Sequence, residues 1–156
     1  MKLRDVMASP VIRIHPDESV AVAARTLAHY NIGILPVCGA DGRLRGLVTD
    51  RDLVTRCVAA GKSPANTTVR EVMTPRLICA APDMDAAEAA GLMGREQIRR
   101  LPVVENGRLC GMVSLGDLSR QQESSLEAGG ALSDISSPLS RRKQGEIRQG
   151  RTVVRW

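Results

Sequence analysis

The chain has 156 residues, which is enough for one compact domain or for two small units that pack together. It contains no Phe, one Tyr and one Trp, so it has almost none of the aromatic surface on which RNA-binding proteins commonly stack bases. Residues 141–156 carry six basic side chains and one acidic one, a net +5 that equals the charge of the whole chain. Residues 1–140 are therefore neutral overall, and the high pI does not indicate a DNA-binding fold.

The sequence argues against a membrane protein and against a metal centre. No apolar run approaches the roughly 18 residues that cross a bilayer, and the N-terminal stretch MKLRDVMASP lacks the apolar segment of a secretory signal. The four cysteines form no CxxC pair, and the two histidines have no ligand-like spacing. We therefore expect a cytoplasmic protein with reduced thiols, no membrane partner, no metal site and no required cofactor.

The first part of the chain predicts a strand, a helix, a β-hairpin and a second helix. The first strand is VIRI at 11–14, and an Ala-rich helix follows it. The apolar stripe of that helix consists of Val20, Ala23, Ala24 and Leu27. The segments ILPVC (34–38) and LRGLVT (44–49) are typical of two strands joined by a tight turn. The second helix is expected over about 50–60, with Gly61 as its C-cap.

The same order returns in the second part of the chain. The offset between the copies is 66 residues up to LPV and 65 after the hairpin, where GADG stands opposite ENG. The copy predicts a strand at 77–80, a hairpin around Asn106-Gly107 and a helix over about 115–122. Its first helix carries the stripe Ala86, Ala89, Ala90 and Met93. Each copy is too small to fold alone, so the two should pack together.

The heptad GLVTDRD, residues 46–52, has a copy in GMVSLGD, residues 111–117. The pairs Thr49/Asp52 and Ser114/Asp117 are acidic variants of a helix capping box, placed where a strand becomes a helix. The same residues also suit a nucleotide: the hydroxyl and Arg51 could bind a phosphate, and the aspartate could accept hydrogen bonds from a ribose. The glycine would let the strand lie close to a bound ligand. Both explanations stay open at this point, and no hydrolytic constellation or P-loop accompanies either.

The two copies in register, with VM, PD, LPV and G(L/M)V(T/S)xxDL at equivalent places, resemble a pair of CBS domains, or Bateman module. The resemblance extends to small stand-alone bacterial CBS proteins of the hypoxic-response type. It implies a mixed α/β (α+β) fold of two β-α-β-β-α units related by a pseudo-two-fold axis. We accordingly divide the chain into unit 1 (1–62), a linker (63–68), unit 2 (69–125) and a polar, basic C-terminal tail (126–156).

The resemblance also implies which residues would bind a ligand. Thr49 and Asp52 match the family's phosphate-side hydroxyl and ribose-binding aspartate, and Ser114 and Asp117 match them in the second copy. Arg51 resembles a phosphate contact, but its counterpart is Gly116, so we expect the first motif to form the stronger site, with Arg99 and Arg100 partly offsetting the loss in the second. The strand segments that would line the cleft are Ile34, Leu35, Pro36, Arg100, Leu101 and Pro102.

The resemblance implies a regulatory protein that is not an enzyme. The expected ligand is AMP, ADP or ATP, with S-adenosylmethionine less expected. Binding would act through conformational or dimer changes of a homodimer on an effector protein in trans. The alternatives are a ligand-free dimerisation module, or binding of nucleic acid or another partner through the basic arm RRKQGEIRQGRTVVRW, with nucleic acid the less favoured partner. The tail itself is expected to be solvated, with a short helix around LEAGGALSDI.

Overall fold

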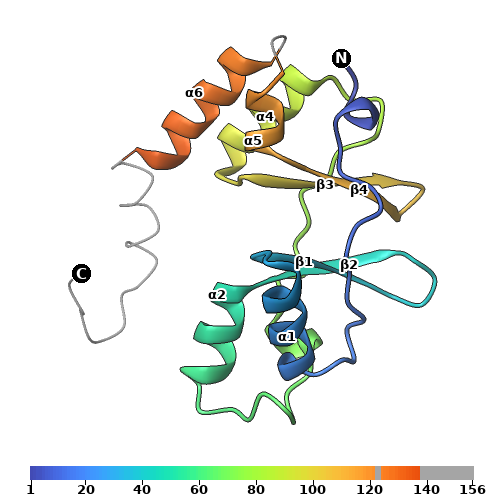
Figure 1. Ribbon diagram of the computed structural model, residues 1–156, viewed down its shortest axis with the longest axis vertical. Helices are drawn as coiled ribbons and strands as arrows, with labels where there is room; N and C mark the ends of the chain where they lie inside the picture. The colour runs from blue at the N-terminus through green and yellow to red at the C-terminus, as the bar shows by residue number, and fades with distance from the viewer. Residues whose placement is uncertain (122–123, 138–156) are drawn as a thin grey trace.

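The computed structural model describes residues 1–121 and 124–137 and consists of two stacked units (Figure 1). Two small β-sheets face each other in the middle of the molecule, and the helices cover their outer faces. The first unit contains α1 (Val20–Tyr30), β1 (Ile34–Cys38), β2 (Leu44–Thr49), α2 (Asp50–Leu53) and the π-helical segment η2 (Val54–Val58). The second contains α4 (Ala86–Glu96), β3 (Arg100–Glu105), β4 (Arg108–Ser114), α5 (Leu115–Ser119) and α6 (Ser125–Ser136). The mixed α/β fold with a repeated unit is confirmed.

Each unit is built around one antiparallel hairpin. Strand β1 pairs with β2, and β3 pairs with β4. The second hairpin turns at Asn106 and Gly107, whose φ angles of 51° and 79° are those of a tight hairpin turn. The turns of the two hairpins also meet, because Leu44 N–H donates to the Gly107 carbonyl at 3.1 Å. The one-residue difference between the copies therefore falls in a turn, as predicted.

The predicted first strand of each unit is reduced to a single parallel bridge. Ile14 pairs with Val37, and Ala80 pairs with Val103. Continuing each ladder by one step would require an N–H from Pro36 or Pro102, and proline has none. The strands predicted at 11–14 and 77–80 are therefore wrong in length, for a reason present in the LPV segment itself.

The two units exchange short segments. Leu3, in the one-turn helix η1 (Leu3–Asp5), is buried in the core of the second unit. Val69 and Val72, in helix α3 (Val69–Val72), are buried in the core of the first. Each segment thus precedes one copy of the repeat in sequence and completes the core of the other. The exchange ties the two units together.

The helices differ between the units. The segment after β2 is helical over 50–58, but only its first turn is α-helical. Gly61 has φ of 70°, as its predicted role at the helix C-terminus requires. Helix α5 ends at Ser119, short of the predicted 122.

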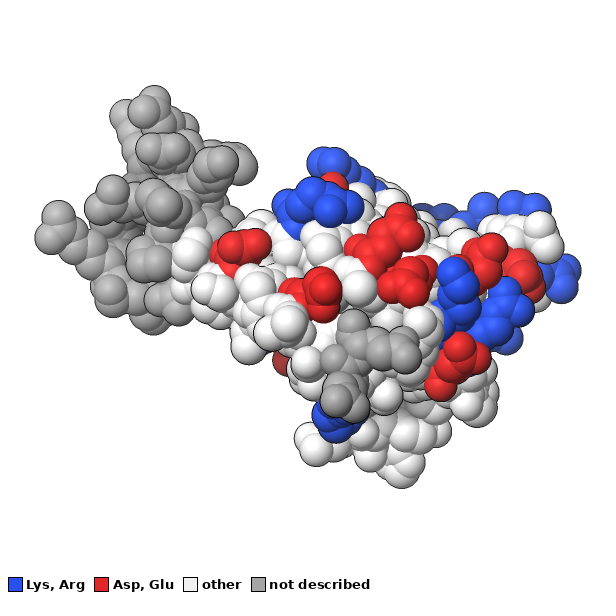
Figure 2. Space-filling view, turned by 90° about the horizontal axis from the view of Figure 1, so that it is seen from above, with Lys and Arg blue, Asp and Glu red and all other residues white. Residues whose placement is uncertain are grey.

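Basic and acidic side chains are interspersed over the outer face of the second unit (Figure 2).

Helix α6 has no counterpart in the first unit. It confirms the helix expected around LEAGGALSDI, and its Ala128 and Ala131 are buried against the second unit. Because α6 covers α4, Ala90 is fully buried, whereas its counterpart Ala24 is exposed, contrary to the predicted stripe. The basic arm lies outside the described residues.

Candidate functional site

Two clefts lie between the units and correspond to each other under the internal repeat. The first cleft, of about 690 Å³, carries Thr49 and Asp52. The second cleft, of about 300 Å³, carries Ser114 and Asp117 in the equivalent places. The opposite walls also correspond, since Thr74, Arg76 and Ile78 in the first cleft match Ala8, Pro10 and Ile12 in the second. The heptad copies therefore stand at matching positions in two separate clefts.

Both heptads form complete capping boxes. Thr49 Oγ1 accepts from Asp52 N–H at 3.1 Å, and Asp52 Oδ2 accepts from Thr49 N–H at 2.9 Å. In the second copy Ser114 Oγ accepts from Asp117 N–H at 3.0 Å, and Asp117 Oδ2 accepts from Ser114 N–H at 2.9 Å. The capping role is thus present at both sites. It positions each aspartate at the rim of its cleft.

Capping occupies only one oxygen of each carboxylate. Asp52 Oδ1 makes no hydrogen bond in the described part of the chain and lies 3.8 Å from Arg56 Nε, while Asp117 Oδ1 accepts a hydrogen bond from Arg120. The side chains remain 15% and 30% exposed, respectively. A carboxylate can act as a cap with one oxygen and accept from a ligand with the other, so capping and ligand binding are compatible.

The glycines that begin the heptads serve a different purpose from the predicted one. A Cβ on Gly46 would lie 2.9 Å from the Thr74 carbonyl oxygen and 2.9 Å from Met73 Sδ. A Cβ on Gly111 would overlap Met7 Sδ and lie 3.1 Å from the Ala8 carbonyl oxygen. Both glycines therefore allow the exchanged segments, rather than a ligand, to approach the strands.

The strand segments alternate between cleft and core. Ile34 lines both clefts and Pro36 lines the second, whereas Leu35 between them is fully buried in the core of the first unit. Leu101 is likewise fully buried in the core of the second unit. Successive strand side chains point to opposite faces, so the assignment of the Leu35 and Leu101 side chains to the cleft is corrected: they are core residues. Pro102 is also buried and does not line either cleft.

The first cleft is much richer in positive charge. It is lined by the four guanidinium groups of Arg51, Arg76, Arg99 and Arg100. In the described part of the chain, none of them forms an ion pair with a carboxylate. Arg99, expected to compensate the second site, lines the first cleft and also a pocket of about 450 Å³ that contains Ser114 and Gly116, so it lies beside the second motif as well.

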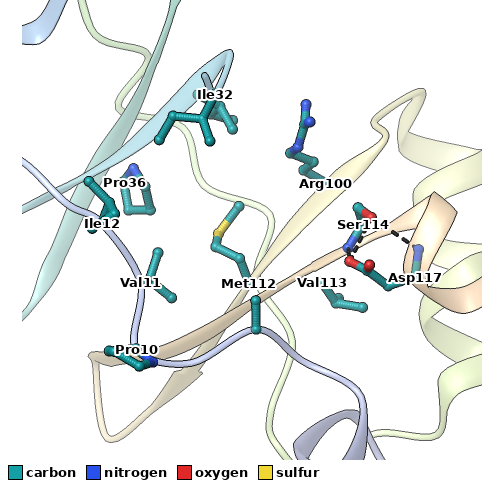
Figure 3. Close-up of a pocket in the computed structure, with 12 residues that line it drawn as sticks. Pro10, Val11, Ile12, Ile32, Pro36, Arg100, Met112, Val113, Ser114 and Asp117 are labelled. Carbon is teal, nitrogen blue, oxygen red and sulfur yellow. Dashed lines mark hydrogen bonds between the residues drawn. The ribbon is translucent and has the colours of Figure 1, made fainter. Parts of the chain in front are cut away.

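The second cleft is largely apolar. Figure 3 shows Val11, Ile12, Ile32 and Met112 around the cavity, with Ser114 and Asp117 at one end.

The opposite walls of both clefts were missed from the sequence. The repeat makes Arg76 and Ile78 equivalent to Pro10 and Ile12, but the sequence does not show which cleft each segment faces.

Other chemistry is sparse in the described residues. No group of three or more His, Cys, Asp or Glu is placed there to hold a metal ion. Burial raises the pKa of the Cys38 and Cys79 thiols above their ordinary value. No helix among residues 1–121 and 124–137 has the length and apolar character needed to cross a membrane.

The two stacked units define a tandem-repeat protein with two equivalent clefts between its halves, and each cleft is a candidate ligand site. A family model for the CBS domain matches residues 3–59 and 69–124. The chain belongs to the CBS domain family. It is similar to the CBS domain-containing protein YhcV of Bacillus subtilis, with 40% identity over 134 residues, 86% of this chain and 94% of that protein. It is also similar to hypoxic response protein 1 of Mycobacterium tuberculosis, with 35% identity over 117 residues, 75% of this chain and 82% of that protein.

Solved structures show the same fold. The crystal structure of Hypoxic Response Protein I with two coordinated zinc ions matches with a TM-score of 0.72 and 34% identity, covering 78% of this chain and 98% of that one. The CBS domain pair of protein MJ0100, in complex with 5′-methylthioadenosine and S-adenosyl-L-methionine, matches with a TM-score of 0.68 and 31% identity. That match covers 77% of this chain and 94% of that one. The related CBS pair of MJ0100 thus binds adenosine-type ligands.

Proposed function

We propose that this protein is a non-enzymatic sensor of an adenine nucleotide (AMP, ADP or ATP), with the first cleft as its principal site. The observation that carries the proposal is a group of four arginines that, among the described residues, pair with no carboxylate and surround a cleft that also holds Asp52. The adenosine ligands of the related MJ0100 pair support the ligand class.

The parts of the first cleft match the parts of a nucleotide. Guanidinium groups form charge-assisted, bidentate hydrogen bonds with phosphates. The unshared oxygen of Asp52 suits the ribose hydroxyls, and Ile78 and Ile98 offer apolar walls to the base. Arg51, Arg76 and Arg99 line the first cleft in addition to Arg100, which the two clefts share. This number of cations favours a ligand that carries more than one negative phosphate charge.

The output of such a sensor requires a second protein. We propose a cytoplasmic homodimer in which ligand binding changes the angle between the two units. A separate effector protein would respond to that change. The exposed apolar side chains Val54 and Val58, which are 58% and 60% exposed on the outer side of the first unit, support a contact with another chain. A ligand-free dimerisation module is the competing function.

Calorimetric titration of the wild-type protein with AMP, ADP, ATP and S-adenosylmethionine separates these functions. The sensor predicts saturable binding of at least one of the three adenine nucleotides, weakened by added salt and by Arg51→Gln. The salt dependence follows because phosphate–arginine attraction is screened by ions. Absence of binding by all four compounds at millimolar concentration would leave the dimerisation module.

A further inference from the structure

Arg100 stands at the boundary of the two clefts. It is the first residue of β3 and lines both cavities, as does Ile34, the first residue of β1 and its counterpart in the repeat. These two positions are therefore shared by the clefts, and only one of them carries a charge. In the view of Figure 3 the Arg100 side chain lies between Ile32 and Ser114.

The two clefts depend on Arg100 to different degrees. In the described part of the chain, Arg100 is the only Lys or Arg that lines the second cleft, whereas Arg51, Arg76 and Arg99 also line the first. Arg120 does not line the second cleft, and its guanidinium is already hydrogen-bonded to the Asp117 carboxylate. The loss of Arg100 would thus remove the cation from the lining of the second cleft itself and leave Arg99 in the pocket that shares Ser114 with it.

The Arg100 side chain is also free to change partners. It is exposed, and within the described residues it makes no side-chain hydrogen bond or ion pair. Its guanidinium carries a single positive charge, so a phosphate paired with it in one cleft neutralises the charge that a phosphate in the other cleft would need. A phosphate bound in one cleft would therefore withdraw the charge from the other.

We propose that Arg100 couples the two clefts, so that a phosphate-bearing ligand in the first cleft lowers the affinity of the second for another such ligand. The inference rests on the proposed nucleotide binding and specifies how the two sites regulate each other. Because the coupling is a free energy, it is reciprocal. We expect a reduction of about tenfold, within the range usual for coupled sites.

The test is calorimetric titration with AMP, which carries one phosphate. Asp52→Asn and Asp117→Asn each weaken one cleft and give the intrinsic affinity of the other, while asparagine preserves the cap. In the wild-type protein the second cleft should bind about tenfold more weakly than in Asp52→Asn. In Arg100→Gln the two values should agree.

Two controls isolate the shared charge. Arg76→Gln removes the same charge from a residue that lines the first cleft and neither of the pockets beside Ser114, so it should weaken the first site and leave the coupling factor unchanged. In an Asp52→Asn background, Arg100→Gln should weaken AMP but not adenosine, which has no phosphate. Equal melting temperatures of the variants would show that folding is intact.

The outcomes separate this inference from the proposed function. Coupling that persists or grows in Arg100→Gln would mean that the two phosphates repel each other directly, and would overturn the role of Arg100. Two independent, equal sites in the wild-type protein would overturn the coupling and leave nucleotide binding intact. No AMP binding by the wild-type protein would overturn both.

Discussion

Replacing Gly46 by alanine should loosen the contact between β2 and the exchanged segment at 72–74. The new Cβ would lie 2.9 Å from the Thr74 carbonyl oxygen and 2.9 Å from Met73 Sδ. The methionine side chain can turn away, but the carbonyl belongs to a bridge in which Thr74 N–H donates to Leu47 at 2.8 Å and Leu47 N–H donates to Thr74 at 3.1 Å. Overpacking of this kind costs about 1–3 kcal/mol of unfolding free energy.

Urea denaturation measures that loss, and hydrogen exchange locates it. We expect faster exchange at the Leu47 and Thr74 amides than at amides of α4, since the bridge opens locally first. Gly129→Ala is the matched control. A Cβ there has nothing within 4 Å, and alanine in a helix should stabilise α6 by about 0.5–1 kcal/mol.

The outcome also decides what the heptad glycine does. If Gly46 serves the approach of a ligand instead of the approach of the chain, Gly46→Ala will retain wild-type stability and exchange but lose nucleotide affinity. That result would refute the structural role assigned to both heptad glycines.

Three further predictions test the site and the packing around it. Asp52→Asn keeps an oxygen acceptor for the cap but loses the charge, so calorimetry should give at least about tenfold weaker nucleotide binding at a nearly unchanged melting temperature; normal affinity would exclude a ligand contact. Ala131→Leu should lower the unfolding free energy in urea by about 1–3 kcal/mol by pushing α6 from α4, whereas Leu132→Ala, at a side chain 49% exposed, should change it by less than about 0.5 kcal/mol. The hydrogen bond from the Arg70 guanidinium lowers the pKa of Asp17. The stabilisation from this pair is therefore fully present above the unfolded pKa of about 4, and it is lost as the pH falls through the lower pKa of the folded state. Urea titrations from about pH 5 to 2 should therefore show a shallower loss of stability in Asp17→Asn, and an unchanged slope would contradict the pairing.

The elements were largely predictable from the sequence because local signals determine them. Asn106-Gly107 predicts a hairpin turn, and the Thr49/Asp52 and Ser114/Asp117 spacings predict the capping boxes. The internal repeat, being independent of any single motif, predicts two equivalent units. The turn and the capping boxes each depend on residues within a few positions of one another.

The pairing of distant segments was not predictable in the same way. The repeat shows that residues 3–8 and 69–74 are equivalent, but not that each completes the core of the other copy. Which segment faces a heptad depends on that exchange, so Arg76 could not be assigned to the cleft of Asp52. The assignment of Leu35 to the cleft failed for a simpler reason, since strand alternation places it in the core.

We propose that a nucleotide binds between the units on the Asp52 side. A crystal structure of the protein with ATP would show where the ligand binds. We expect the ribose hydroxyls at the Asp52 carboxylate, the phosphates among Arg51, Arg76 and Arg99, and the base against Ile78 and Ile98. ATP bound outside both clefts, or a first cleft that remains empty at saturating ATP, would contradict it.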